Sequence, residues 1–305
     1  MLEVLNSSAP YLLTIAAVKL LSNLGYISKS MKPAASELVG KIALPLIIFG
    51  TLLKINFTID DFDLFLLGLV LVFVLQGTIY GLTKLFKIEK SKQMAMVLSF
   101  GSLSLGTVVY PLALLNFGDA VFQKVVLFDS IGWFIVFLTF SQFFAQIKSD
   151  EEHSFSESLK KIATSPSVLA IVFGLGLNLL NLTPSLLQNT VDFSSKSFGF
   201  LAALMVGLNL SLPRLKTVFF IAIAFFARMI FVVLIAVVAS YFLHFDKNTE
   251  TAVLLSMFSP ASVMGLIFTG QYGFDEKYYT QVLAISTIIS LFMLPIAATY
   301  LKANI

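Results

Sequence analysis

The chain has 305 residues, of which 58% are hydrophobic and only 12% are charged, and its formal net charge is +3. Soluble domains average about 25% charged residues, so this composition excludes a water-soluble globular fold and indicates an integral membrane protein. The apolar runs are about 20 residues long, which fits transmembrane helices and not the shorter strands of a membrane barrel. The sequence contains no cysteine, which excludes disulfides, thiolate metal sites and cysteine nucleophiles.

Hydropathy along the chain predicts ten membrane spans, which together take up nearly all of the sequence. In chain order they are 10–26, 34–53, 65–86, 94–117, 122–146, 166–182, 193–212, 218–243, 251–272 and 278–301. The start of the chain lacks a basic region followed by a small-residue cleavage site, so we expect the first span to insert uncleaved. The expected fold class is therefore an all-α membrane protein with ten transmembrane helices.

The fourth and ninth spans are interrupted by polar and helix-breaking residues. The first interruption, 98–111, combines glycines, serines and a threonine with Pro111, and the second, 256–265, combines serines and a glycine with Pro260. In lipid every backbone N–H and C=O needs a partner, so a broken helix persists only where it is buried in protein or lines a cavity. Two interrupted spans at matching places in two halves of a chain indicate the binding site of a transporter.

The polar stretch 148–165 divides the chain into two halves, 1–147 and 166–305, each with five predicted spans. Because five is an odd number, the second half must enter the membrane upside down relative to the first. The halves also echo each other weakly after the broken spans, where 116–127 matches 271–283. Inverted repeats whose discontinuous helices cross near the midplane are a transporter architecture. We therefore expect two inverted five-helix repeats joined by a linker at 148–165.

Lysine and arginine fall mostly on one side of the predicted topology. That side holds Lys29, Lys32, Lys84, Lys87, Lys90, Lys92, Lys148, Lys160, Lys161, Arg214, Lys216 and Lys277. The opposite side holds only Lys54, Lys124, Lys196, Lys247 and Lys302. Because the side rich in positive charge faces the cytoplasm, both termini are expected outside and the linker in the cytoplasm of a cell membrane.

The segment 117–129, from Phe117-Gly118-Asp119 to Leu127-Phe128-Asp129, follows a Gly/Ser-rich stretch that ends in Tyr110-Pro111-Leu112-Ala113-Leu114. This combination resembles the auxin efflux carrier (PIN-like) family, which includes bacterial organic-acid permeases. Further similar segments, in the same order and spacing over the whole chain, are 42–49, 204–210, 259–273, 285–287 and 294–295. The resemblance implies a scaffold and a mobile transport domain with two crossed broken helices, the fourth and the ninth.

One position departs from the family pattern. The family usually has an asparagine about seven residues before the proline of the fourth span, where its amide can reach a substrate carboxylate; here Ser104 stands at that position. A hydroxyl offers one donor, whereas an amide offers two donors and an acceptor. The family's substrate contact is therefore in question at this position.

The candidate substrate-binding residues come from the two interruptions and from one buried charge. They are Ser102, Ser104, Thr107, Tyr110, Pro111, Ser259, Pro260, Ser262 and Arg228. Prolines inside a membrane helix free backbone carbonyls, and opened half-helices can direct their N-termini at an anion. The alternatives are that the prolines are ordinary kinks, as we expect for Pro45 and Pro295, and that the hydroxyls bond to their own helices.

Two charged residues lie inside predicted spans. Arg228, near the middle of the eighth span, suits a carboxylate because its planar guanidinium can form two parallel hydrogen bonds; alternatives are snorkelling or a structural ion pair. Asp129 in the fifth span is the candidate counter-charge or proton carrier, with a position near the interface as the alternative. Glu37 and Lys41 are spaced for a structural ion pair along one helix, and Lys19 is expected to snorkel, with a place in the cavity as the alternative.

The leading hypothesis is a secondary transporter of a small organic anion, a carboxylate by the resemblance, that works by elevator-like or rocking alternation. No phosphate-cradling motif is present, so the chain is not expected to hydrolyse ATP. The expected partners are the organic anion, a proton or sodium ion as alternatives for the coupling ion, and the lipid bilayer. No nucleic acid, cofactor or metal is expected, and a homodimer is left open.

Three other functions are alternatives for a helical membrane protein of this kind. A sodium-coupled bile-acid-type symporter has the same architecture but needs acidic and amide ligands beside the crossing, where this sequence has mostly hydroxyls. An intramembrane enzyme needs a nucleophile–base pair or metal ligands within the spans, and both histidines, His153 and His244, lie in or beside predicted loops. A receptor without flux has no need of two broken helices.

Overall fold

The structure, a computed structural model, describes residues 2–28, 30–55, 61–148, 159–160, 162–182, 185–210 and 215–304. Within these residues every regular element is helical. Six stretches are long and apolar enough to cross a membrane: Leu2–Asn23, Met31–Lys54, Phe62–Leu85, Lys90–Ala145, Val218–Leu243 and Glu276–Asn304. The predicted all-helical, multi-pass membrane fold is thereby confirmed. Most of the predicted linker 148–165, with Lys161 in it, lies outside the described residues, as do Lys29 and Arg214.

Helices cover the predicted spans, although several of their ends differ from the prediction. In chain order they are α1 (Leu2–Asn23), α2 (Met31–Leu38), α3 (Leu44–Lys54), α4 (Phe62–Leu85), α5 (Lys90–Phe100), α6 (Tyr110–Leu127), α7 (Ile135–Lys148), α9 (Pro166–Leu179), α10 (Ser185–Asn209), α11 (Leu215–Leu243), α12 (Lys247–Ser256), α13 (Val263–Gln271) and α14 (Glu276–Asn304). Short π-helical turns join several of them: η1 (Val39–Ala43), η3 (Leu105–Val109) and η4 (Phe128–Phe134). α1 begins at Leu2 and not at the predicted Pro10, which it accommodates internally.

Glycine and proline explain where the long apolar stretches bend. Gly118 has φ 72° and ψ −166°, so α6 is kinked there; glycine tolerates a positive φ without steric cost. Gly273, just after α13, has φ 68°. Pro45 comes directly after the π turn η1, inside the continuous stretch Met31–Lys54. The predicted kink at Pro45 therefore takes the form of a widened turn, since proline has no N–H to close the preceding one.

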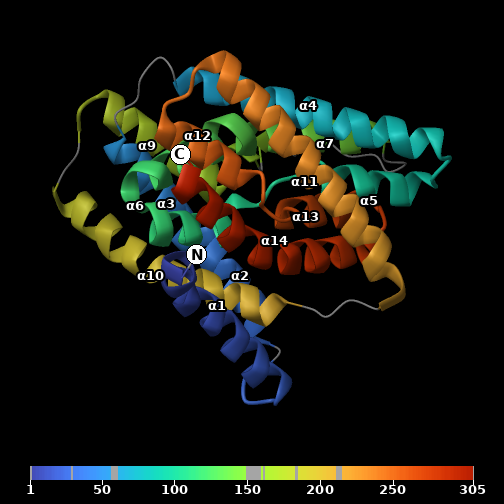
Figure 1. The fold of residues 1–305 in the computed structure, drawn as a ribbon, viewed down its shortest axis with the longest axis horizontal. Helices are drawn as coiled ribbons and strands as arrows, with labels where there is room; N and C mark the ends of the chain where they lie inside the picture. Colours follow the sequence, from blue (N-terminus) through green and yellow to red (C-terminus); the bar gives the residue numbers. More distant parts are fainter. Residues whose placement is uncertain are drawn as a thin grey trace.

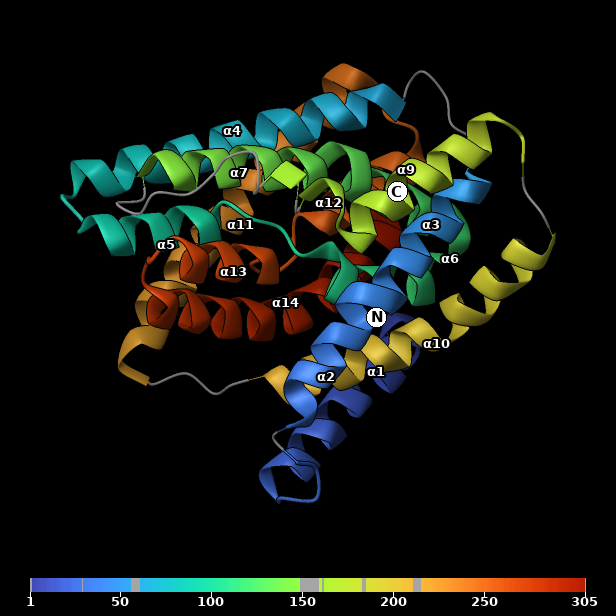
Figure 2. The same cartoon turned by 180° about the vertical axis from the view of Figure 1, so that it is seen from behind.

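The helices pack as two groups, each drawn from both halves of the sequence. We call α1, α2, η1, α3, α9 and α10 the first helix group, in which α3 packs on α9 and α1 packs on α10. We call the remaining elements, α4 to α7 and α11 to α14, the second helix group, in which α4 packs on η4 and α6 packs on α12. Figures 1 and 2 show the two groups side by side. The packing therefore cuts across the division of the chain at its middle.

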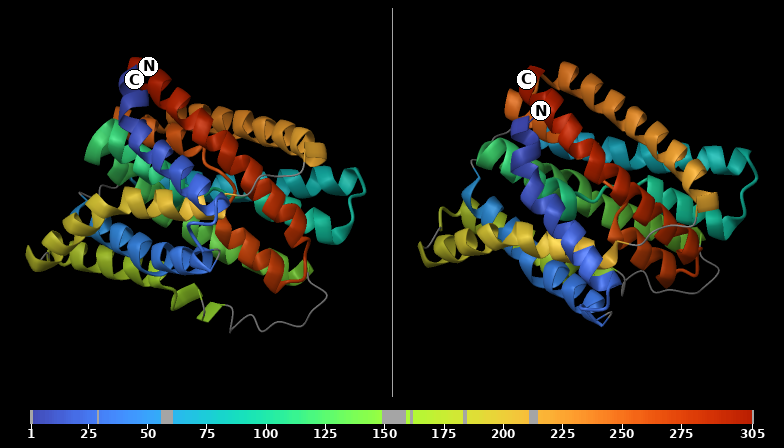
Figure 3. Two further views of the ribbon diagram at one scale, coloured as in Figure 1. Left: turned by 90° about the horizontal axis from the view of Figure 1, so that it is seen from below. Right: turned by 60° about the horizontal axis from the view of Figure 1, so that its bottom comes forward.

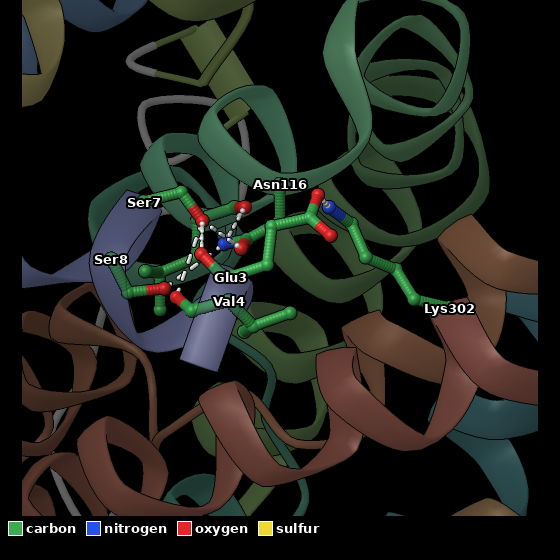
Figure 4. Close-up of polar contacts among 7 residues, drawn as sticks. Glu3, Val4, Ser7, Ser8, Asn116 and Lys302 are labelled. Carbon is green, nitrogen blue, oxygen red and sulfur yellow. Dashed lines mark hydrogen bonds and ion pairs between the residues drawn. The ribbon is translucent and has the colours of Figure 1, made fainter. Parts of the chain in front are cut away.

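The two groups meet through α1, α3 and α10 on one side and η3, α6 and α14 on the other. Near the chain ends, Ser7 donates to Asn116 Oδ1 at 2.6 Å, and Asn116 Nδ2 donates to Ser8 Oγ at 3.0 Å. Lys302 Nζ lies 2.8 Å from Glu3 Oε1 (Figure 4). The two termini consequently lie together, as Figure 3 shows. This placement agrees with an even number of membrane crossings.

Candidate functional site

The two interrupted segments meet in the second helix group. α5 ends at Phe100 and α12 ends at Ser256, and an irregular segment follows each of them. The backbone N–H of Ser104 donates to the carbonyl of Pro260 at 3.0 Å, and the N–H of Ser262 donates to Ser102 Oγ at 2.9 Å. These bonds join the two irregular segments directly. The backbone groups that each break releases are thus satisfied partly by the other break.

Each irregular segment leads into the start of another helix. η3 begins at Leu105 with Ser104 as its N-cap. α13 begins at Val263, and Ser262 Oγ caps it by accepting from the N–H of Met264 at 3.2 Å. The first N–H groups of a helix have no partner inside the helix and carry a partial positive charge. Because the two irregular segments are hydrogen-bonded to each other, these two helix starts and their partial positive charges lie next to each other.

A cavity of about 80 Å³ lies beside these two helix starts and the facing surfaces of α10 and α14. It is lined by Ser104, Thr107, Met205, Val206, Asn209, Leu210, Pro260, Ala261, Val263, Thr280, Leu283, Ala284 and Thr287. We call it the crossing cavity. None of these lining residues is acidic, and their polar groups are hydroxyls and one amide. Lys19 on α1 donates to the carbonyl of Leu210, which places a cation at the edge of the cavity.

The crossing cavity contains only some of the predicted site residues. Ser104, Thr107 and Pro260 line it, whereas the remaining candidates from the interruptions do not. Ser102 Oγ donates to the Ser99 carbonyl and accepts from the backbone N–H of Ser262, and the Ser262 hydroxyl accepts from the N–H of Met264, so both hydroxyls bond to the backbone of the breaks. Ser259 is fully buried. The roles predicted for these three serines as direct substrate contacts stay predictions.

The contributions of α10 and α14 to this cavity are not predicted from the sequence. From α14 come Thr280, Leu283, Ala284 and Thr287, which are spaced along one helical face. From α10 come Met205, Val206, Asn209 and Leu210. A polar stripe on an otherwise apolar membrane helix was the available signal, since the threonines recur on the same face. Only the packing of the helices shows that this face meets the two breaks.

A second cavity, of about 430 Å³, lies between the helix groups on the other side of η3. We call it the α6 cavity. It is lined by Pro10, Tyr11, Thr14, Ile47, Tyr110, Pro111, Leu114, Leu115, Phe122, Lys196, Phe198, Gly199 and Phe200. The predicted residues Tyr110 and Pro111 therefore lie here and not in the crossing cavity. The Tyr110 hydroxyl donates to Asp129 Oδ2 at 2.8 Å, and both side chains are buried.

Pro111 affects the backbone hydrogen bonding one turn earlier, at Thr107. Its missing N–H leaves the carbonyl of Thr107 without the partner that an α-helix would supply. The hydroxyl of Tyr11 on α1 donates to this carbonyl. Because Tyr11 lines the α6 cavity and Thr107 lines the crossing cavity, this bond links the two helix groups between the two cavities.

We expect Tyr11→Phe to destabilise the protein by about 0.5–1.5 kcal/mol, because it removes the hydrogen bond to the part-buried Thr107 carbonyl while keeping the ring. Thermal unfolding of the purified protein in detergent measures the effect. Tyr300→Phe is the matched control, since Tyr300 is exposed at the end of the chain and should melt like the wild type. Equal melting of the two variants would show that the Tyr11 bond contributes nothing to stability.

Arg228 is held by both breaks. It is 6% exposed, and its guanidinium nitrogens donate to the backbone carbonyls of Phe100, Ser102, Met257 and Ser259. It does not line either cavity. Direct binding of a carboxylate, one of the roles that the sequence left open, stays a prediction without support from this geometry. The predicted Glu37–Lys41 ion pair is present at 2.6 Å.

The described residues contain no cluster of three or more histidine, aspartate or glutamate side chains that could hold a metal ion. The crossing cavity is lined by hydroxyls, one amide and apolar side chains beside two helix starts, with Lys19 at its edge. Such a set can form hydrogen bonds to a small polar solute.

Comparison with known proteins agrees with this architecture. The sequence profile of the family described as membrane transport protein matches residues 11–298. The chain is 22% identical over 293 residues to a protein from Methanothermobacter thermautotrophicus described as an uncharacterized transporter, and the match covers 93% of this chain and 96% of the relative. The resemblance to auxin efflux carriers is confirmed, since this is the family to which that profile belongs. The chain belongs to the membrane transport protein family of multi-pass membrane transporters.

Proposed function

We propose that this transporter moves a small organic anion, of the carboxylate class, through the crossing cavity. The observation that carries the proposal is the meeting of two helix starts, η3 and α13, at a cavity whose lining has no acidic residue. Each helix N-terminus carries about half of a positive elementary charge. Two of them together match one carboxylate, and Lys19 adds a further positive charge at the edge.

The mechanism we propose is alternating access by movement of the second helix group against the first. Both cavities lie between the two groups, with α10 contributing to each. The bonds that join the two breaks lie wholly inside the second group, so the breaks can move as one body. A substrate held at the crossing would then be exposed first to one side of the membrane and then to the other, as in other transporters with broken helices.

Inverted five-helix repeats, 1–147 and 166–305, form part of this proposal. Gly118 and Gly273 both adopt a positive φ just after a broken span, and each helix group takes helices from both halves. The excess of lysine and arginine on one side favours a cytoplasmic linker at 148–165 and outward-facing termini in a cell membrane. The driving ion, a proton or a sodium ion, remains to be tested. The same holds for assembly of the chain into a homodimer.

Asn209→Asp tests the sign of the substrate charge. Asn209 lines the crossing cavity, and the substitution keeps its volume while adding a negative charge near the bound solute. At about 6 Å and an effective dielectric of about 20, repulsion of an anion is worth about 2.8 kcal/mol, so KM for a carboxylate should rise roughly 100-fold. Uptake of labelled mono- and dicarboxylates into proteoliposomes, with imposed proton or sodium gradients, measures it.

Asn304→Asp is the control, because Asn304 is exposed at the end of α14 and should leave KM unchanged. A lower KM in Asn209→Asp would show that the solute is a cation and would overturn the proposal. Absence of saturable carboxylate uptake in the wild type under every gradient would also overturn it, since the cavity would then serve another class of solute.

A further inference from the structure

Arg228 occupies a cage of backbone carbonyls formed by both broken helices. Its Nε donates to Phe100 O at 3.3 Å and its Nη2 to Ser102 O at 2.6 Å. Its Nη1 donates to Ser259 O at 3.1 Å and to Met257 O at 3.4 Å. Each break thus contributes two carbonyls, two residues apart in sequence. The planar guanidinium bonds to both breaks at once.

These carbonyls lie just at and beyond the C-terminal ends of α5 and α12, which end at Phe100 and Ser256. A helix C-terminus carries about half of a negative elementary charge, so two of them offset one cation. No acidic side chain among the described residues forms an ion pair with Arg228. Its neighbours include the ring of Phe225, whose centroid lies 5.3 Å from the guanidinium carbon. Among the described residues, the charge is therefore balanced by backbone dipoles, with the Phe225 ring beside it, and not by an acidic side chain.

In transporters with broken helices, the unwound carbonyls and half-helix C-terminal ends are the groups that coordinate a coupling sodium ion or proton. In this chain the same class of groups is already bound to a side chain. We propose that Arg228 is a resident cation of the crossing, which takes the place of an exchangeable alkali cation and makes the crossing independent of sodium. Only the expected effects on flux rest on the proposed function; the expected effects on melting do not.

Removing the side chain should leave a vacant site for a monovalent cation of the guanidinium class. We expect purified Arg228→Ala to melt roughly 5–10 °C below the wild type, because its carbonyl cage loses its donors. Low millimolar guanidinium chloride, far below denaturing concentration, should restore part of this loss in a saturable manner, whereas choline chloride at equal concentration should not. Arg228→Lys, which keeps the charge but not the planar fork, should melt between the two.

Met229→Ala is the matched control. Met229 is the next residue on α11, is buried in the same cluster as Phe100, and carries no donor. The melting temperature of Met229→Ala should therefore not rise when guanidinium is added. The wild type should melt at the same temperature in sodium and choline chloride. Selective stabilisation of the wild type by sodium would overturn the inference even if Arg228→Ala cannot be purified, and so would an Arg228→Ala protein that responds equally to guanidinium and choline.

Flux is measured separately. If the wild type transports a carboxylate, its rate should be equal in sodium and choline media, and guanidinium should restore flux in Arg228→Ala. A sodium requirement for wild-type flux would contradict the resident-cation role. If no carboxylate moves at all, the proposed function fails while the melting curves still decide the role of Arg228.

Discussion

Gly68→Ala is expected to prevent the protein from folding. Gly68 on α4 lies against Gly132 in η4, and a Cβ atom on Gly68 would lie 1.5 Å from the carbonyl oxygen of Gly132. A Cβ on Gly132 would in turn lie 2.4 Å from the carbonyl oxygen of Leu64. The backbones of α4 and η4 therefore touch, as membrane helices do where small residues let them approach. No side-chain rotation can relieve a clash with backbone.

The cost of Gly68→Ala should reach at least about 4–5 kcal/mol, the range in which a membrane domain no longer accumulates. Yield of monodisperse protein in detergent and its melting temperature measure the effect. Gly77→Ala on the same helix is the control, because a Cβ there would meet no atom within 4 Å. It should stabilise α4 by up to about 1 kcal/mol. Equal yields of the two variants would show that α4 and η4 are not packed this closely.

A cross-link between the helix groups is expected to abolish transport. The chain has no cysteine, so an introduced pair of cysteines can react only with each other or with the added reagent. Ser7→Cys with Asn116→Cys joins α1 of the first group to α6 of the second, where the two side chains are 2.6 Å apart. After oxidation, or bridging with a short bis-thiol reagent, uptake should fall to that of empty vesicles. A reductant should restore it, because only the relative motion of the groups is blocked.

The control cross-link stays inside one helix group. Thr83→Cys with Gln93→Cys joins α4 to α5, both in the second group, where Gln93 Nε2 lies 3.0 Å from Thr83 Oγ1. This cross-link should leave uptake intact, since the group is proposed to move as one body. The single-cysteine variants show the effect of losing each hydrogen bond alone. Undiminished uptake in the cross-linked Ser7–Asn116 protein would show that transport proceeds without motion at this contact.

The two experiments concern two kinds of contact, one inside a helix group and one between the two groups. Gly68 lies inside the second helix group, where the packing of α4 on η4 is part of the folded core. Ser7 and Asn116 lie between the groups, and their contact is made of hydrogen bonds that can exchange for others. We therefore expect a core contact to control folding and a contact between groups to control transport.

The sequence by itself was sufficient to predict a multi-pass helical membrane protein and its family. Long apolar runs have no stable alternative in lipid, because every backbone group must be satisfied within the span. The two interruptions were also visible in sequence, because serine, glycine and proline together disfavour a continuous helix. The breaks that the structure shows, after Phe100 and after Ser256, fall inside the predicted segments.

Only the tertiary structure decided which residues surround the crossing cavity and what Arg228 does. The face of α14 with Thr280 and Thr287, and Asn209 on α10, come from spans without an interruption, so nothing in the sequence placed them beside the two breaks. Arg228 suggested a carboxylate partner, yet its partners are four backbone carbonyls from two segments far apart in the chain. A backbone carbonyl is present at every residue, so no side-chain pattern in the sequence marks the few that helix breaks leave free. The packing of α11 against both breaks selects them.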